Sequence, residues 1–201
     1  VLEAARRAGS EIVGHGRSNS DSLSALAPDA ERAYLRDVAE RIRAHEGTAP
    51  GGWSSPWLSH TPNTLNLLAD NGYRYLLDLR LDDQPVWLTT ESGPLLAIPY
   101  NAEINDSSTM IGRQASAHEF EAMIVDEFTE LSAAATQVPL VMSVVLHSFI
   151  TGVPFRLRAV RRALESIVGA DGVWFTTPRE IHHAVVESSQ LFPPPVAEVT
   201  S

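Results

Sequence analysis

The chain alternates between short apolar runs and longer segments in which apolar residues recur every three or four positions. The run 139–146 is apolar on both faces, which predicts a buried strand. The spacing of apolar residues in 28–45, followed by Gly47, predicts an amphipathic helix. Repeated strand-then-helix patterns are typical of an α/β domain with a parallel sheet. We expect a single domain over 1–187 and an extended or disordered, proline-rich tail over 188–201.

The expected strands are 11–14, a short run ending at Trp53, 73–78, 94–100, 139–146 and 173–176, and the expected helices are 1–8, 28–45, 61–71, 116–131, 155–168 and 178–186. The polar segments 79–93 and 101–115 are long for a compact domain, so they are predicted binding loops. Polar or aromatic residues follow nearly every expected strand. This distribution favours a barrel-like ring, where functional residues gather at the strand ends, over a crevice between two strands.

Charge and composition narrow the range of partners. The 201 residues include 25 acidic and 15 basic ones, which gives a formal net charge of −10. Such a chain repels phosphate backbones and anionic lipid, so neither nucleic acid nor a membrane is an expected partner. There is no cysteine, which excludes disulfides and thiolate chemistry. The apolar runs are too short to span a bilayer, and we expect a cytoplasmic protein.

Two histidines are the leading candidates for catalysis. His147 follows the most apolar run of the chain, where an imidazole can serve as a general acid or electrophile. The alternative is a histidine whose ring only binds a backbone carbonyl. His15 lies between Gly14 and Gly16, which allow a sharp turn or the close approach of a ligand.

Other polar and aromatic residues are weaker candidates. Trp53 and Trp57 lie in or next to loops, where an indole can cover a polar substrate, but burial in the core is an equal alternative. Asp82 and Asp83 are adjacent in a predicted loop and could bind a cation or a polar substrate, although such pairs are more often solvated turn residues. The triplet that begins at Asn105 matches a glycosylation pattern that is too short to be informative.

Several motifs, taken in order, resemble the polysaccharide deacetylase (NodB-homology) family, in its allantoinase-like and peptidoglycan-deacetylase-like branch. The resemblance covers about residues 2–187. The motifs are Gly14-His15-Gly16, Gly52-Trp53-Ser54-Ser55-Pro56, Tyr73-Arg74-Tyr75 with Asp78, Asp82-Asp83-Gln84-Pro85, and Leu146-His147 followed by Gly152-x-Pro154-x-Arg156. The ordered set is far more specific than any one of its members.

The resemblance implies an irregular (β/α) barrel of the NodB type, incomplete at the N-terminus, because the family's aspartate-bearing first motif precedes the region where this chain begins. It also implies hydrolysis of a non-peptide C–N bond, such as the N-acetyl amide of a sugar polymer or a bond of a cyclic ureide. His147 matches the residue that protonates the leaving amine. His15 matches the first metal-binding histidine, whereas Asn19 stands where zinc-using members have the second. Zinc is therefore expected to bind weakly or not at all.

The candidate catalytic residues are thus His147 and His15. The candidate substrate-binding residues are Trp53, Pro56, Trp57, Asp78, Asp82, Asp83 and Arg156. One alternative is a catalytically inactive, truncated homologue that acts as a binding or assembly module, and another is a metal-independent hydrolase that uses other carboxylates. An incomplete barrel leaves an open sheet edge, so we expect a homo-oligomer.

Overall fold

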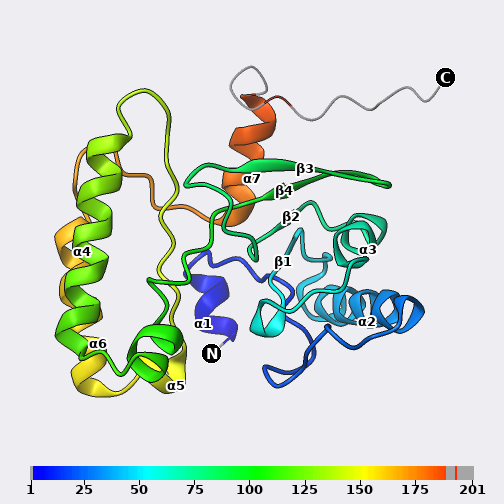
Figure 1. The fold of residues 1–201 in the computed structure, drawn as a ribbon, viewed down its shortest axis with the longest axis horizontal. Coiled ribbons are helices and arrows are strands. Elements are labelled where there is room, and N and C mark those ends of the chain that lie inside the picture. The colour runs from blue at the N-terminus through cyan, green and yellow to red at the C-terminus, as the bar shows by residue number, and fades with distance from the viewer. Residues whose placement is uncertain (1, 189–192, 194–201) are drawn as a thin grey trace. The chain divides into compact units, whose positions relative to one another are not determined.

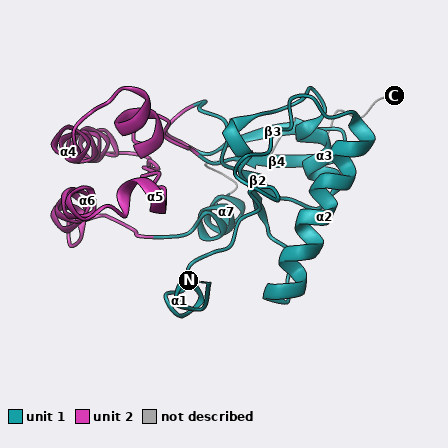
Figure 2. Cartoon of the chain, turned by 90° about the horizontal axis from the view of Figure 1, so that it is seen from below, with its two compact units in different colours: residues 1–81, 85–98, 176–201 teal, residues 82–84, 99–175 magenta. Residues whose placement is uncertain are grey.

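A computed structural model of the chain describes residues 2–188 and 193 (Figure 1). The described residues form two compact units (Figure 2). Unit 1 takes its residues from 1–81, 85–98 and 176–201, and unit 2 takes its residues from 82–84 and 99–175. Each unit is described by itself below.

Unit 1 is built on a four-stranded sheet with the order β1-β2-β4-β3. The strands β1 (Gly52–Trp53), β2 (Tyr75–Leu76) and β4 (Gly93–Ala97) run parallel, and β3 (Val86–Thr90) pairs antiparallel with β4. The sheet does not close on itself, and an isolated bridge joins Gly14 to Trp53 beside β1. The α/β class is thereby confirmed, with an open, mixed sheet.

The helices of unit 1 are α1 (Leu2–Arg7), α2 (Pro28–Glu46), the 3-10 turn η1 (Pro56–Leu58), α3 (Thr64–Asp70) and α7 (Pro178–Glu187). Helix α2 ends where Gly47 adopts a left-handed conformation, as its position in the sequence predicts. The core of the unit forms around the fully buried Trp53, whose indole makes edge-on contacts with Tyr34 and Tyr73. These aromatic contacts join the buried face of α2 to the sheet.

The named secondary-structure elements of unit 2 are all helices. It contains the π-helix η2 (Ser107–Gly112), α4 (Ala117–Ala134), α5 (Ser148–Thr151) and α6 (Pro154–Ile167). Helices α4 and α6 lie side by side (Figures 1 and 2). Their shared core includes the buried Phe120, Ile124, Ile150 and Val160. Ser116 and Glu119 form the capping box that their spacing predicts at the start of α4.

Several predicted strands are wrong. Segments 11–14 and 139–146 each form a single bridge, Gly14 with Trp53 and Asn105 with Val145, and 173–176 forms none among the described residues. An apolar run becomes a strand only where a neighbouring backbone pairs with it, and the run itself does not encode that partner. Conversely, β3 lies within the predicted loop 79–93, where Val86–Thr90 is rich in β-branched and aromatic residues.

The predicted single domain over 1–187 stays a prediction beside the two compact units. The predicted tail falls mostly outside the described residues. No helix in the described part of the chain is both long and apolar enough to cross a membrane. The cytoplasmic location and the homo-oligomer also stay predictions.

Candidate active site

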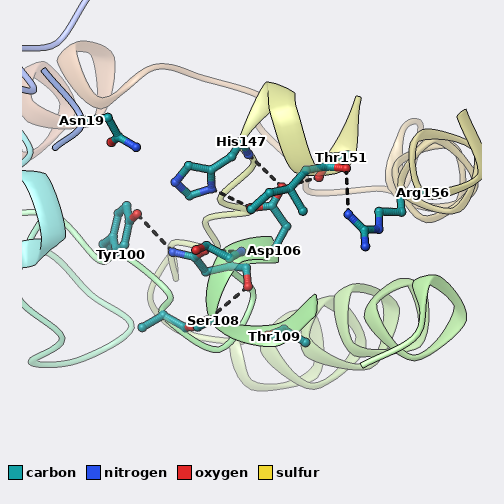
Figure 3. Close-up of polar contacts among 12 residues, drawn as sticks. Asn19, Tyr100, Asp106, Ser108, Thr109, His147, Thr151 and Arg156 are labelled. Carbon is teal, nitrogen blue, oxygen red and sulfur yellow. Dashed lines mark hydrogen bonds and ion pairs between the residues drawn. The ribbon is translucent and has the colours of Figure 1, made fainter. Parts of the chain in front are cut away.

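In unit 2, the imidazole of His147 is held by a buried carboxylate, that of Asp106 (Figure 3). The His147 backbone N–H donates to Asp106 Oδ2 at 2.8 Å, and Nδ1 lies 2.6 Å from Oδ1. Asp106 is fully buried, whereas the His147 side chain is 25% exposed. Asp106 therefore holds both the backbone and the ring of the predicted catalytic histidine.

The Asp106 carboxylate accepts a third hydrogen bond. The hydroxyl of Thr151, one turn further along α5, donates to Asp106 Oδ2. With the carboxylate accepting at Oδ1, the ring of His147 carries its proton on Nδ1, and the lone pair on Nε2 is left available. Within the described residues Nε2 has no hydrogen-bond partner. This is the arrangement in which an imidazole takes up a proton and delivers it to a substrate.

Local backbone structure brings these two residues together. The Val145 N–H donates to the Ile104 carbonyl and the Asp106 N–H donates to the Val145 carbonyl, so the two segments form the bridge described above. His147 follows as the N-cap of α5, and its carbonyl accepts from the N–H groups of Ile150 and Thr151. The end of the predicted strand thus becomes a tight turn that begins at the histidine.

In unit 1, His15 is held in an exposed loop by two contacts. Its Nδ1 lies 2.7 Å from the Ser54 carbonyl oxygen and its Nε2 lies 3.1 Å from Asn19 Oδ1. The neighbouring glycines are needed because protein side chains pack against them, whereas the sequence predicted a sharp turn or the close approach of a ligand. A Cβ on Gly14 would lie 2.8 Å from the Trp53 ring, and one on Gly16, which has a φ of +82°, would lie 2.5 Å from the Tyr34 hydroxyl oxygen.

A second histidine–carboxylate pair lies in unit 1. The Asp78 carboxylate, fully buried, accepts from the Ser55 N–H at 2.7 Å, and its Oδ2 lies 2.8 Å from His60 Nε2. Both oxygens of Asp78 are therefore engaged inside the protein. A direct contact between Asp78 and a substrate would require one of these bonds to break, so the observed role of Asp78 is to hold the turn 55–60.

The predicted substrate-binding residues in the segment 53–57 differ in how exposed they are. Trp53 is fully buried and Pro56 is buried, so the proposal that the Trp53 indole covers a substrate is corrected: its size and its aromatic partners place it in the core. Trp57 is 74% exposed and has a φ of 58°. That left-handed conformation is costly for a bulky residue, and such residues cluster at functional sites.

The remaining predicted contacts lie in unit 2. Asp82 and Asp83 are exposed, with the Asp83 N–H bound to Asp82 Oδ1 at 2.7 Å. Burial, and then the negative charge of Asp83, raise the pKa of Glu127 above its ordinary value. The Arg156 guanidinium donates to the Ile150 carbonyl at 3.4 Å, so it supports the turn of α5.

Comparison with protein-family models gives no match for the chain. Two curated proteins are similar to it. A protein of Schizosaccharomyces pombe named as a polysaccharide deacetylase is 25% identical over 201 aligned residues, which cover 92% of this chain and 62% of that protein. The peptidoglycan deacetylase of Helicobacter pylori is 29% identical over 99 residues, which cover 49% of this chain and 33% of that protein.

The similar solved structures include an allantoinase and a polysaccharide deacetylase. The crystal structure of Puue allantoinase matches with a TM-score of 0.84 and 27% identity, over 97% of this chain and 64% of that one. A polysaccharide deacetylase structure from Pseudomonas aeruginosa matches with a TM-score of 0.80 and 26% identity, over 90% of this chain and 61% of that one. The chain is thus similar in sequence and in fold to polysaccharide deacetylases of the NodB-like family and to allantoinase.

These similarities confirm the predicted resemblance to the NodB-like family, and the open α/β fold corresponds to an incomplete irregular barrel of that type. The similar proteins are named as deacetylases and as an allantoinase. The chain spans about 62% of the length of the curated relative that it matches over most of its own length.

Zinc does not fit the donor set that the structure describes. In the described part of the chain, no three or more histidine, cysteine, aspartate or glutamate residues are placed to hold a metal ion. Near His15 the second position is occupied by the amide of Asn19, which is a poor zinc ligand. No step in the proposed chemistry is therefore assigned to a metal.

Sequence reasoning missed Asp106 and the pairing of His60 with Asp78. Asp106 lies in the predicted loop 101–115, 41 positions before His147, and no local spacing connects the two residues. The only available signal was an aspartate in a long polar segment between two apolar runs. His60 and its carboxylate partner are 18 positions apart, so no local spacing connects them either.

Proposed function

We propose that this chain hydrolyses a non-peptide C–N bond, either the N-acetyl amide of a saccharide or a bond of a cyclic ureide. The observation that carries the proposal is the fixed His147–Asp106 pair, with Nε2 of His147 left available. A buried carboxylate that fixes the tautomer and orientation of a histidine is a recurring feature of sites that transfer protons.

In the proposed reaction, the oxygen of water adds to the carbonyl carbon while one proton of that water passes to the lone pair on Nε2 of His147. The C–N bond then breaks, and the leaving nitrogen takes this proton from Nε2 and departs as an amine, which leaves a carboxylic acid and returns Nε2 to its unprotonated form. Asp106 keeps Nδ1 protonated through the 2.6 Å contact, so that Nε2 is the nitrogen that exchanges protons with the substrate. Thr151 and the His147 backbone N–H hold the carboxylate in place during this exchange.

Unit 1 carries proposed binding residues of its own. His15 presents its imidazole on an exposed loop, and Trp57 presents an exposed indole in the turn that follows Ser54. Asp82 and Asp83 of unit 2 are proposed polar contacts because both are exposed. Pro56 supports the turn that carries Trp57, since it is buried and packs close to Gly16.

A second candidate function is a binding or assembly module that does not catalyse. The observation in its favour is the absence, among the described residues, of a grouped set of metal-binding side chains. The two candidates differ in whether a bond is broken, and they agree that a saccharide or small molecule is bound.

The experiment is an assay of the full 201-residue chain against N-acetylated oligosaccharides and against allantoin, each with and without Zn²⁺. Release of acetate or opening of the ureide ring, at a rate that exceeds the uncatalysed rate, supports the hydrolase. Binding of either compound without turnover under all conditions contradicts the hydrolase and supports the module.

A further inference from the structure

An exposed aromatic ring lies beside the proposed proton donor. The ring centroids of His147 and Phe149 are 5.5 Å apart, with the planes at 61°, an edge-on arrangement. Phe149 is 69% exposed, although it belongs to the same turn as the buried Ile150 and Thr151. The largest apolar side chain of this turn therefore faces solvent next to the imidazole.

The turn that carries Phe149 is fixed on both sides. Ile150 packs in the core of unit 2, and Thr151 donates its hydroxyl to Asp106. Gly152 closes the turn, because a Cβ there would lie 2.2 Å from the Ser148 carbonyl oxygen. Arg156 adds a hydrogen bond to the Ile150 carbonyl. Because its neighbours are anchored, Phe149 has a backbone position that is set relative to His147.

Exposure of this ring has no evident benefit for the stability of the chain. A phenylalanine stabilises a fold by removing its surface from water, and Phe149 leaves most of its surface in water. A rigid, exposed aromatic side chain instead offers binding area with little loss of conformational entropy when a ligand covers it. The position of the ring, next to His147, indicates a ligand that also reaches the imidazole.

We propose that Phe149 is a substrate-contact residue that covers the apolar C–H face of the sugar ring bearing the scissile amide. This inference rests on the proposed function, in which Nε2 of His147 protonates the leaving nitrogen. In an N-acetylated sugar that nitrogen is bonded directly to a ring carbon, so the sugar ring lies within a few bonds of the imidazole. The side chain adjoining the imidazole is Phe149, and its ring presents an apolar surface to that sugar ring.

The experiment measures binding of an N-acetylglucosamine tetramer to the full chain by NMR titration, together with the rate of acetate release. The variants are Phe149→Ala, Phe149→Leu and Phe149→Tyr. Phe155→Ala is the matched control, because Phe155 is 62% exposed in the same unit and stacks with Arg156. Thermal unfolding of every variant checks that the fold is kept.

We expect Phe149→Ala and Phe149→Leu to weaken tetramer binding about tenfold, and Phe149→Tyr to keep it within about twofold, because only Tyr retains the ring face. Phe155→Ala should bind like the unchanged chain. Leu retains apolar bulk over His147, so normal binding by Phe149→Leu would show that Phe149 only shields the imidazole and would overturn the inference.

The two proposals can fail separately. If all three Phe149 variants release acetate at the unchanged rate, the proposed hydrolase activity is kept and the proposed substrate contact is overturned. Tetramer binding that depends on Phe149, in a chain that shows no turnover, supports the contact and contradicts the hydrolase. An unchanged chain that binds no tetramer overturns the contact.

Discussion

Asp106 determines which nitrogen of His147 carries a proton. The carboxylate accepts from the backbone N–H of His147, from Nδ1 of its ring and from the Thr151 hydroxyl, and it is fully buried. A buried carboxylate with three donors cannot be replaced by an amide without loss, because an amide has only one oxygen and brings an N–H of its own.

Replacing Asp106 with Asn should therefore both weaken the fold and disturb the histidine. We expect the free energy of unfolding to fall by about 2–3 kcal/mol and turnover to fall at least about 100-fold. Urea unfolding measures the first effect. The ¹⁵N chemical shifts of the His147 ring should show the proton moving from Nδ1 to Nε2, and an unchanged tautomer would contradict this account of Asp106.

His182 is a buried histidine outside the proposed site. It lies on α7 in unit 1, packed against the rings of Tyr75 and Trp87, and its Nδ1 is buried with no hydrogen-bond partner among residues 2–188. Burial, with smaller contributions from the charges of Arg74 and His183, lowers the pKa of His182 to about 4. The folded protein therefore holds this imidazole neutral where an unfolded chain, with a pKa near 6.5, would protonate it.

The stability of the fold should consequently depend on pH in a defined window. Above about pH 6.5 His182 is neutral in both states and contributes no pH dependence. As the pH falls from about 6.5 to about 4, the unfolded state gains a proton that the folded state does not, so stability should fall by up to about 3 kcal/mol. Urea unfolding at several pH values measures this slope. The slope should shrink in His182→Leu and persist in His183→Gln, since His183 is exposed. An equal slope in both variants would contradict the assignment of this pH dependence to His182.

At the scale of elements, a buried glutamate joins α2 to the start of α3. Glu31 on α2 is fully buried, with Oε2 accepting from the Thr61 hydroxyl at 2.6 Å and Oε1 from the Thr64 hydroxyl at 2.5 Å. Thr61 directly follows His60, the partner of Asp78. The carboxylate of Glu31 thus fixes both the first residue of α3 and the end of the turn that carries His60.

Comparing Glu31→Gln with a matched variant at an exposed glutamate separates the contribution of the two hydrogen bonds from the general effect of removing one negative charge. The amide cannot accept at both positions, so one threonine hydroxyl loses its partner, and we expect a loss of about 1–3 kcal/mol in the free energy of unfolding. The matched control is Glu40→Gln on the same helix, where the side chain is exposed and no loss is expected. Equal unfolding midpoints for the two variants would show that the Glu31 contacts contribute nothing.

Helix prediction worked where local sequence decides the structure. The apolar period of α2 and the capping box of α4 are encoded within the segments themselves, and both helices form as expected. Strand prediction failed at 139–146, because pairing depends on distant residues and only Val145 finds a bridge partner. The hairpin of β3 and β4 was missed because polar and turn-forming residues on both sides of β3 give the segment 79–93 the overall character of a loop.

At the scale of the whole molecule, the ordered motifs predicted a resemblance to the polysaccharide deacetylase family, and the comparisons confirm that resemblance. The same motifs identified His15 and His147, which follow apolar segments and stand beside glycine or at the start of a turn. The carboxylate partners could not be predicted in this way. Asp106 and His147 are paired by the folding of unit 2, and their separation of 41 positions carries no local pattern.

The most direct test of the central claim compares turnover by two histidine variants of unit 2. His147→Gln removes the proposed proton donor, and His118→Gln alters a histidine of α4 whose side chain is 86% exposed. With a substrate that the unchanged chain hydrolyses, the account predicts that His147→Gln loses at least about 100-fold in rate while His118→Gln keeps the full rate. A His147→Gln variant that is folded and hydrolyses the substrate at the unchanged rate would contradict the account.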